Sequence, residues 1–388
     1  MTLGGVTLLL VVAGGSLVSC RRVAPLPQLK IADAPVLREN QPELSFAPVV
    51  KKVSPSVVNI YTAKTVRENP SLSRLNEDPT FRQFFGDAEG YGRVARERRE
   101  QSLGSGIIAS QDGYILTNNH VVQGADEIKV GLADERTVLD AKIVGTDPQT
   151  DVAVIKVQAE KLPAITFTNS DGVEVGDVVL AIGDPFGVGQ TVTMGIVSAK
   201  DRGGLGIEDY EDFIQTDASI NPGNSGGALV DIDGRLVGIS TAILSRGGGN
   251  QGIGFAIPVN LARYIMGRLI SDGKVTRGYL GVKIQSLTPE LATKLKLSGQ
   301  TGAVVSEVTR NSPAEKAGLK KNDVLIEFDG KSVTDSRHLR LIVAEKPPGS
   351  SVSVKVFREG KEQTLTVELG TLPSEDLYQS GGPHDNWR

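Results

Sequence analysis

The sequence predicts a mainly β protein with two folded domains, for three reasons. The chain has 388 residues, and a domain commonly takes about 100–200. It contains 45 glycines, which favours many turns over long helices. Between residues 104 and 258, short apolar runs alternate with Gly, Asp and Asn, as is typical of an all-β barrel or sandwich.

Composition excludes several classes of protein. With 42 basic and 46 acidic residues the net charge is −4, so bulk charge does not hold the chain to nucleic acid or anionic lipid. A hydrophobic content of 39% with 23% charged residues indicates a globular chain. The single cysteine excludes intrachain disulfides and cysteine-based zinc sites, and we expect no cofactor and no metal.

The N-terminal residues predict export from the cytoplasm. Residues 1–19 are apolar or small, as in a signal peptide, although no Lys or Arg precedes the apolar run. The end of this run, LVSC, resembles the lipobox of bacterial lipoproteins, so Cys20 is a candidate lipidation site. An ordinary signal peptide or a retained anchor is the alternative. Residues 20–45 carry four prolines and indicate an extended tether.

We expect the first domain to span residues 46–272. Its strands are predicted at 57–61, 106–108, 114–117, 152–155, 178–182 and 236–239. Residues 67–101 are expected to form a long loop, with the mixed Arg/Glu run at 93–100 as a solvated face. Apolar residues at helical spacing predict a helix over 259–271, followed by a hinge at 272–274.

The second domain is expected at residues 276–371, followed by a flexible tail at 372–388. Ser312, Pro313 and Gly318 have the positions of an N-cap, a first-turn proline and a terminal glycine of a short helix. Thr334-Asp335 opens a second helix that ends before Pro347. Alternating apolar residues from 352 to 369 predict a closing hairpin.

The segment NPGNSGG at 221–227 is a candidate nucleophile turn. Glycines beside Ser225 allow a sharp turn that exposes the hydroxyl and directs backbone N–H groups inward, although a glycine-rich turn with an incidental serine has the same letters. A serine nucleophile needs a base. His120 is the only histidine of the first domain, since His338 and His384 fall outside it.

A third group must orient the imidazole, and Asp140, Asp147 and Asp151 are candidates. Asp151 leads directly into the apolar strand at 152–155, which would hold it rigidly. The order His, Asp, Ser is the one found in chymotrypsin.

Three segments together resemble the HtrA/Deg family of envelope serine proteases: TNNHVV around His120, TDVAVIKV from Thr150, and DASINPGNSGGAL from Asp217. The resemblance implies a chymotrypsin-like pair of six-stranded β-barrels followed by one small α+β PDZ domain. It implies that His120 is general base and acid, that Asp151 orients it and that Ser225 attacks the peptide carbonyl. The backbone N–H groups of Gly223 and Ser225 would form the oxyanion hole.

The resemblance also carries expectations about specificity and control. Trypsin-like specificity needs an acid about six residues before the nucleophile, where this chain has Ser219. The segment from Thr241 through Ala242 and Ile243, together with Ile220, suggests a small apolar pocket for Val, Ala or Ile. Asn224 replaces the Asp that pairs with a freed N-terminus in zymogens, and Arg202 matches a loop arginine that resembles a sensor for the PDZ domain.

In the second domain, the segment RGYLGV at 277–282 resembles a PDZ carboxylate-binding loop. Successive backbone N–H groups at Tyr279, Leu280, Gly281 and Val282 would hold a peptide C-terminus while the peptide adds as a strand. His338 is expected at the surface or at the rim of this groove.

Two further motifs are rejected. The segment GSGIIA at 104–109 matches a dinucleotide fingerprint by letter, but a QDG turn follows it and no helix. The segment DIDG at 231–234 indicates a hairpin turn and not a calcium loop.

The sequence therefore predicts an ATP-independent serine endoprotease that degrades unfolded envelope or secreted proteins, since no P-loop motif occurs. Two alternatives are a regulatory protease that cuts one membrane partner, and a non-enzymatic PDZ adaptor or chaperone. The family implies a homotrimer or larger assembly that binds unfolded polypeptides and peptide C-termini. We expect contact with the membrane only through the N-terminal anchor, and location in the periplasm or cell envelope.

Overall fold

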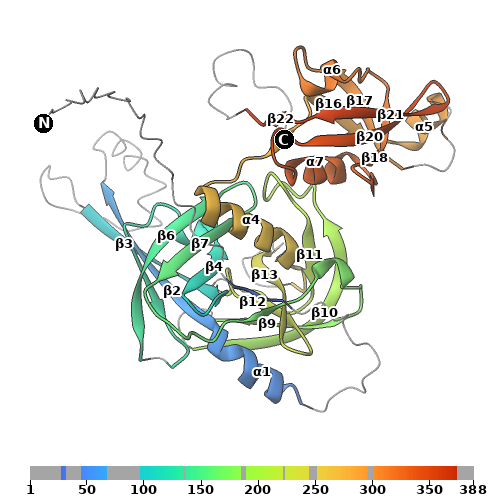
Figure 1. The fold of residues 1–388 in the computed structure, drawn as a ribbon. Helices are drawn as coiled ribbons and strands as arrows, with labels where there is room; N and C mark the ends of the chain where they lie inside the picture. Colours follow the sequence, from blue (N-terminus) through green and yellow to red (C-terminus); the bar gives the residue numbers. More distant parts are fainter. Residues whose placement is uncertain are drawn as a thin grey trace, which may run out of the picture.

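The computed structural model describes most of the chain from residue 45 onward (Figure 1). The described residues are 28–31, 45–67, 97–134, 136–184, 189–221, 223–243, 251–295, 297 and 301–373. Cys20 and the predicted signal peptide lie outside them, as does the predicted tail beyond Pro373. Among the described residues, no helix combines the length and the apolar character needed to cross a bilayer.

The first barrel is a closed antiparallel ring of six strands in the order β2-β3-β4-β7-β6-β5. The strands are β2 (Val57–Arg67), β3 (Glu97–Ile108), β4 (Tyr114–Asn118), β5 (Glu127–Gly131), β6 (Val138–Asp147) and β7 (Val152–Val157). Short apolar strands between turn residues close in this way because a barrel leaves no exposed edge.

The second barrel also closes with six strands. They are β9 (Val178–Gly183), β10 (Thr191–Arg202), β11 (Phe213–Thr216), β12 (Ala228–Asp231), β13 (Arg235–Ile243) and β14 (Gly254–Pro258). The ring closes because β13 pairs with both β12 and β14. The short strands β1 (Lys30–Ile31) and β8 (Thr166–Phe167) extend it, with β8 parallel to β13.

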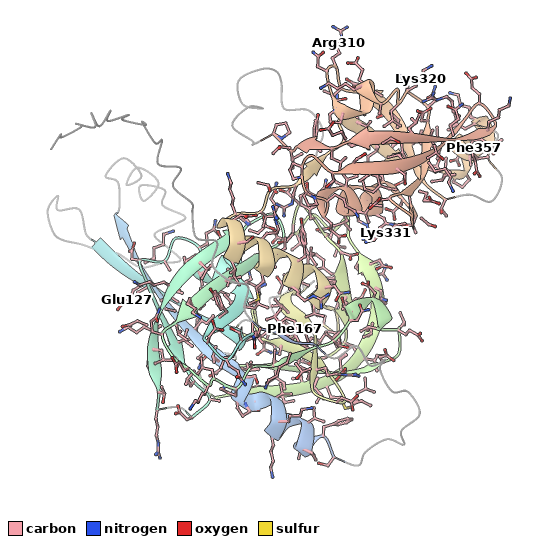
Figure 2. All side chains as sticks on the ribbon, viewed as in Figure 1. Glu127, Phe167, Arg310, Lys320, Lys331 and Phe357 are labelled. Carbon is pink, nitrogen blue, oxygen red and sulfur yellow. The ribbon has the colours of Figure 1, made fainter. Side chains whose placement is uncertain are left out.

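One apolar core joins the two barrels. Fully buried residues from both pack together with α4 (Val259–Asp272), which lies against β6 and β7 of the first barrel and β13 and β14 of the second. Phe167 of β8 lies within this core (Figure 2). Gly273 ends α4 in the left-handed region with φ 70°, a conformation that glycine adopts without strain. The short helix α1 (Ala47–Val53), with its 3₁₀ turn η1 (Ser54–Ser56), precedes β2.

The C-terminal region is a small α+β unit. Its five-stranded path runs β16 (Val282–Ser286), β17 (Ala303–Val308), β18 (Val324–Phe328), β20 (Ser351–Arg358) and β21 (Lys361–Glu368), with β19 (Lys331–Ser332) on β18. β15 (Gly278–Tyr279) pairs with β22 (Gly370–Thr371). The helices are α5 (Pro289–Lys294), α6 (Pro313–Lys316) and α7 (Ser336–Ala344).

The predicted fold class, two six-stranded barrels followed by a small α+β region, is confirmed. The caps are confirmed as well: Ser312 Oγ accepts from Glu315 N at 3.2 Å, and Asp335 Oδ1 accepts from His338 N at 2.8 Å. The expected loop at 67–101 was wrong at both ends, because β2 includes Arg67 and β3 begins at Glu97, opposite it. The rest of that predicted loop, 68–96, lies outside the described residues. Strands pair through backbone hydrogen bonds, so a charged segment can also form a strand, and a polar composition does not distinguish such a strand from a loop.

Candidate active site

His120 and Asp151 meet because two strands of the first barrel end side by side. β4 and β7 are antiparallel with Asn118 opposite Val152, and the short helix α3 (Asn119–Val122) follows β4. The Asp151 carboxylate receives two bonds from His120: backbone N to Oδ1 at 2.9 Å and Nδ1 to Oδ2 at 2.8 Å. Asp151 adopts the left-handed region with φ 55°, a conformation that costs energy outside glycine.

The second barrel contributes a third bond to this carboxylate. Thr241 Oγ1 of β13 donates to Asp151 Oδ2 at 2.6 Å. Asp151 is 2% exposed, whereas the side chain of His120 is 48% exposed. The imidazole is therefore held from its buried side at the junction of the barrels and remains open on the other. The sequence predicts Thr241 as a pocket residue and does not reveal this contact with Asp151.

The other two carboxylates considered for this role lie elsewhere. Asp140 is on β6 opposite Lys129 of β5. Asp147 binds Arg277 and also accepts a hydrogen bond from Thr150 Oγ1 at 2.5 Å. Of the three candidates, the structure brings only Asp151 to His120.

Ser225 lies on a tight turn before β12. Gly223 and Gly226 flank it with φ of 97° and 82°, and Asn224 N donates to Asn221 O at 2.9 Å. A Cβ on Gly226 would lie 2.1 Å from Ser105 O, so only glycine fits there. The Ser225 hydroxyl donates to Thr241 O at 3.3 Å. His120 can take this proton only after the hydroxyl turns away from that carbonyl.

Two groups near this site titrate above their ordinary values. Burial works to lower the pKa of the His120 imidazole, but the hydrogen bond and charge of Asp151, with the charge of Glu208, raise it above 6.5. Burial and the charge of Asp151 raise the pKa of Glu208 to about 7, against the opposing charge of His120. The charge of each group therefore acts on the pKa of the other.

The segment from residue 201 to 212 brings Glu208 to this place. Glu211 folds the segment by accepting bonds from the backbone N–H groups of Leu205 at 2.7 Å, Ile207 at 2.6 Å and Glu208 at 3.1 Å. Arg202, the predicted sensor, donates from Nε to Gln215 Oε1 at 3.0 Å.

Tyr210 of the same segment joins the barrels to the C-terminal region. Two guanidinium groups lie over its ring, with Arg277 Cζ 4.5 Å and Arg340 Cζ 4.9 Å from the ring centroid. Arg277 also forms a buried ion pair with Asp147, Nη2 to Oδ2 at 2.5 Å. Leu341 and Ala344 of α7 pack on Tyr210. Sequence reasoning missed this contact, because neither Tyr210 nor Arg277 belongs to a motif of interdomain packing.

The predicted specificity pocket is described only in part. Ile220 is 1% exposed and packs in the core of the second barrel. The side chains of Ala242 and Ile243 lie outside the described residues.

Among the residues that the structure describes, β16 is the edge strand of the C-terminal sheet, with β17 on one side, and α7 lies against it. The carbonyls of Leu280 and Gly281 accept bonds from Ala314 N and Thr309 N, both at 2.9 Å. Because a trans peptide directs its N–H away from its C=O, the N–H groups of Gly281 and Val282 face the opposite side. Such a row of backbone donors can receive a carboxylate.

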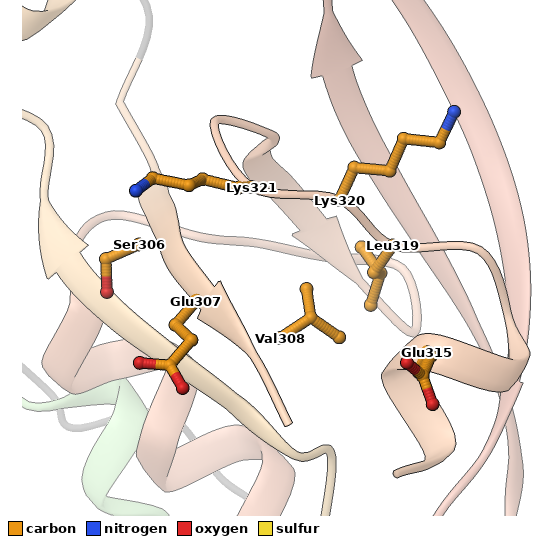
Figure 3. A pocket seen from close by; sticks show the side chains of 7 residues that line it. All are labelled: Ser306, Glu307, Val308, Glu315, Leu319, Lys320 and Lys321. Atoms are coloured by element: carbon orange, nitrogen blue, oxygen red, sulfur yellow. The ribbon is translucent and has the colours of Figure 1, made fainter. Parts of the chain in front are cut away.

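A separate cavity of about 500 Å³ lies on the same region (Figure 3). It is lined by Ser306, Glu307, Val308, Glu315, Leu319, Lys320 and Lys321. None of these residues comes from β16 or α7, so the cavity is distinct from the edge described above.

Comparison with known proteins matches both parts of the chain. Residues 104–239 match the trypsin-like peptidase domain family, and residues 278–369 match the PDZ domain family. The chain is 47% identical over 343 residues to a probable periplasmic serine endoprotease DegP-like of Chlamydia trachomatis serovar D, covering 85% of this chain and 69% of the relative. It is 45% identical over 347 residues to the periplasmic serine endoprotease DegP of Escherichia coli (strain K12), covering 84% and 72%.

Solved structures are similar as well. The HtrA-type protease AlgW with a decapeptide has 50% sequence identity and a TM-score of 0.67, covering 85% of this chain and 100% of that one. AlgW with a tripeptide has 48% identity and a TM-score of 0.70, covering 86% and 99%.

Proposed function

Because the chain belongs to the HtrA/DegP family of serine endoproteases, with a trypsin-like domain and one PDZ domain, we propose that it degrades unfolded or damaged envelope proteins without ATP. The observation that carries the proposed chemistry is the double contact of Asp151 with His120. An ionised carboxylate only accepts, so it holds the proton on Nδ1 and leaves Nε2 as the base.

In the proposed reaction, Ser225 attacks the peptide carbonyl while His120 Nε2 takes the hydroxyl proton and then passes it to the leaving amine. Asp151 stabilises the imidazolium that forms. The N–H groups of Gly223 and Ser225 stabilise the oxyanion, and each such donor is typically worth about 10²–10³ in rate. The acyl-enzyme is then hydrolysed by water through the same groups.

The direct test is Ser225→Ala, with Ser332→Ala on the exposed strand β19 as the matched control. We expect Ser225→Ala to abolish casein cleavage without lowering the melting temperature, and Ser332→Ala to keep full activity. Cleavage that persists in the pure Ser225→Ala protein would overturn the assignment.

We propose that cleavage follows small aliphatic residues. The proposal is supported by Ser219, which offers no charge to a Lys or Arg side chain at the predicted pocket. Mass spectrometry of the casein products tests it. Products that end mainly in Lys or Arg would contradict it.

We also propose that the PDZ domain binds peptide C-termini as an added strand on β16. The edge position of β16 and the N–H groups of Gly281 and Val282 support this, as do the peptide complexes of AlgW. Comparing the affinities of a labelled peptide and of the same peptide with an amidated C-terminus separates binding of the carboxylate from addition of the peptide strand to β16. Equal affinity for both forms would refute recognition of the carboxylate.

Location and assembly are further parts of the proposal. Relatives described as periplasmic support an envelope location, and we propose a homotrimer, a cleaved signal peptide and lipid attachment at Cys20. Sedimentation tests the trimer, and palmitate labelling of the chain and of Cys20→Ser tests the anchor. Comparing the proteome of cells that carry active or Ser225→Ala protein separates general quality control from cleavage of one dedicated partner.

A further inference from the structure

The segment Gly104-Ser105-Gly106, rejected above as a nucleotide motif, lies in β3 against the Ser225 turn. Its glycines are explained by packing. A Cβ on Gly104 would lie 2.7 Å from Val121 Cγ1, and one on Gly106 would lie 2.8 Å from Ile60 Cδ1. Ser105 stands between these two glycines in the sequence and is completely buried, and packing alone does not explain a polar side chain at this position.

Ser105 holds the turn at two carbonyls. Its backbone N donates to Ser225 O at 2.8 Å, and its Oγ donates to Gly223 O at 2.7 Å. The same Oγ accepts from Asp184 N at 2.9 Å. The N–H of Asp184 can only donate, so the hydroxyl of Ser105 accepts from it and directs its own single proton to Gly223 O.

Gly223 and Ser225 are also the residues whose N–H groups form the proposed oxyanion hole. Gly223 has φ 97° and no Cβ, so local sterics do not determine its orientation. The peptide between Gly223 and Asn224 is instead held at both ends, by Ser105 Oγ at its carbonyl and by Asn221 O at its N–H.

On the other side of the hydroxyl, Asp184 is itself held by hydrogen bonds. Asp184 follows β9, is 6% exposed, and its carboxylate accepts from Asn59 Nδ2 and from Gly189 N. Asn59 lies directly opposite Ser105 in the β2–β3 register. Gly183 packs on the turn as well, since a Cβ there would lie 2.7 Å from Asn224 Oδ1.

We propose that Ser105 is a positioning residue for the oxyanion hole. Its hydroxyl connects Asp184 N, at the end of β9, to Gly223 O, and so keeps the turn in the conformation that stabilises the transition state. This inference rests on the proposed protease function. Ser105 contacts neither His120 nor Asp151 among the described hydrogen bonds, so its removal is expected to act on the rate and not on the titration of the base.

The test compares Ser105→Ala with Ser110→Ala. Ser110 is 1% exposed in the same barrel, and its Oγ accepts from Tyr114 N at 3.2 Å, away from the turn. Removing an oxyanion donor costs about 10²–10³ in rate, so a donor that is present but poorly held is expected to cost about 10-fold. We expect Ser105→Ala to lower kcat on labelled casein about 10-fold, with KM within about twofold and an unchanged midpoint of the pH–rate profile.

Ser110→Ala is expected to lower the stability of the protein without lowering kcat. A kcat for Ser105→Ala equal to that of Ser110→Ala, with both proteins folded, would overturn the proposal. If Ser105→Ala does not fold, Ser105→Cys takes its place, because a thiol is similar in size but a weak donor; a wild-type kcat for it would also overturn the proposal. Cleavage by Ser225→Ala would instead refute the protease function itself, so the two failures are distinguishable.

Discussion

Replacing Thr241 by valine removes one hydrogen-bond donor from the buried Asp151 carboxylate, which also accepts from His120. Asp151 has three donors in the structure, and Thr241 Oγ1 shares Oδ2 with His120 Nδ1. Valine keeps the shape, so the loss is that of one hydrogen bond to a charged acceptor, about 1.5–3 kcal/mol. At about 2–4 °C per kcal/mol for a domain of this size, we expect the melting temperature to fall by about 3–12 °C.

Activity is expected to fall as well, because the carboxylate gains freedom to rotate away from the imidazole. We expect about a 10-fold loss of kcat/KM on casein, equivalent to about 1.4 kcal/mol. Thr216→Val is the matched control, since Thr216 is fully buried in the same barrel and its Oγ1 accepts from Ala218 N at 3.1 Å. If Thr241→Val matched this control in both measurements, the orienting role of the hydroxyl would be refuted.

Three further predictions concern pH, the domain contact and the turn. Activity should fall as pH drops through a midpoint above 6.5, and Glu208→Gln should lower that midpoint, because the charge of Glu208 helps to raise the pKa of His120. The raised pKa also adds stability that is present at low pH and is lost as pH rises through it, so stability and activity move in opposite directions. Arg277→Met should lower the free energy of unfolding, measured in urea, by about 3–5 kcal/mol, because it leaves Asp147 buried without its cation. Gly226→Ala should cost more than about 4 kcal/mol or prevent folding.

Each of these has its own control. An unchanged pH midpoint in Glu208→Gln would exclude the electrostatic coupling. For the ion pair, the double variant Arg277→Met with Asp147→Asn should cost less than Arg277→Met alone, and simple additivity would contradict the pairing. For the turn, Gly267→Ala in α4 meets open space and should stabilise by about 0.5–1 kcal/mol; a similar gain at Gly226 would show that the turn is not constrained.

Local chemistry allowed much of the fold to be predicted. The helix over 259–271, the caps at Ser312 and Asp335 and the closing hairpin follow from spacing, capping and alternation within a few residues. The same signals did not reveal α1 or α5, whose short segments carry too few turns for a clear period. They also did not reveal the start of β3 at Glu97, where pairing with a distant strand decides the conformation.

The candidate site divides in the same way. The sequence alone determined the residue types and the turns: a single imidazole in the barrels at His120, a strand beginning just after Asp151, and glycines around Ser225. Tertiary structure alone decided the partners, because Thr241 and Asp151 are 90 residues apart and Ser105 and Gly223 are 118 apart. A local pattern specifies which side chains are buried and how the chain turns, but which buried hydroxyl meets which carbonyl depends on how the two closed barrels pack together.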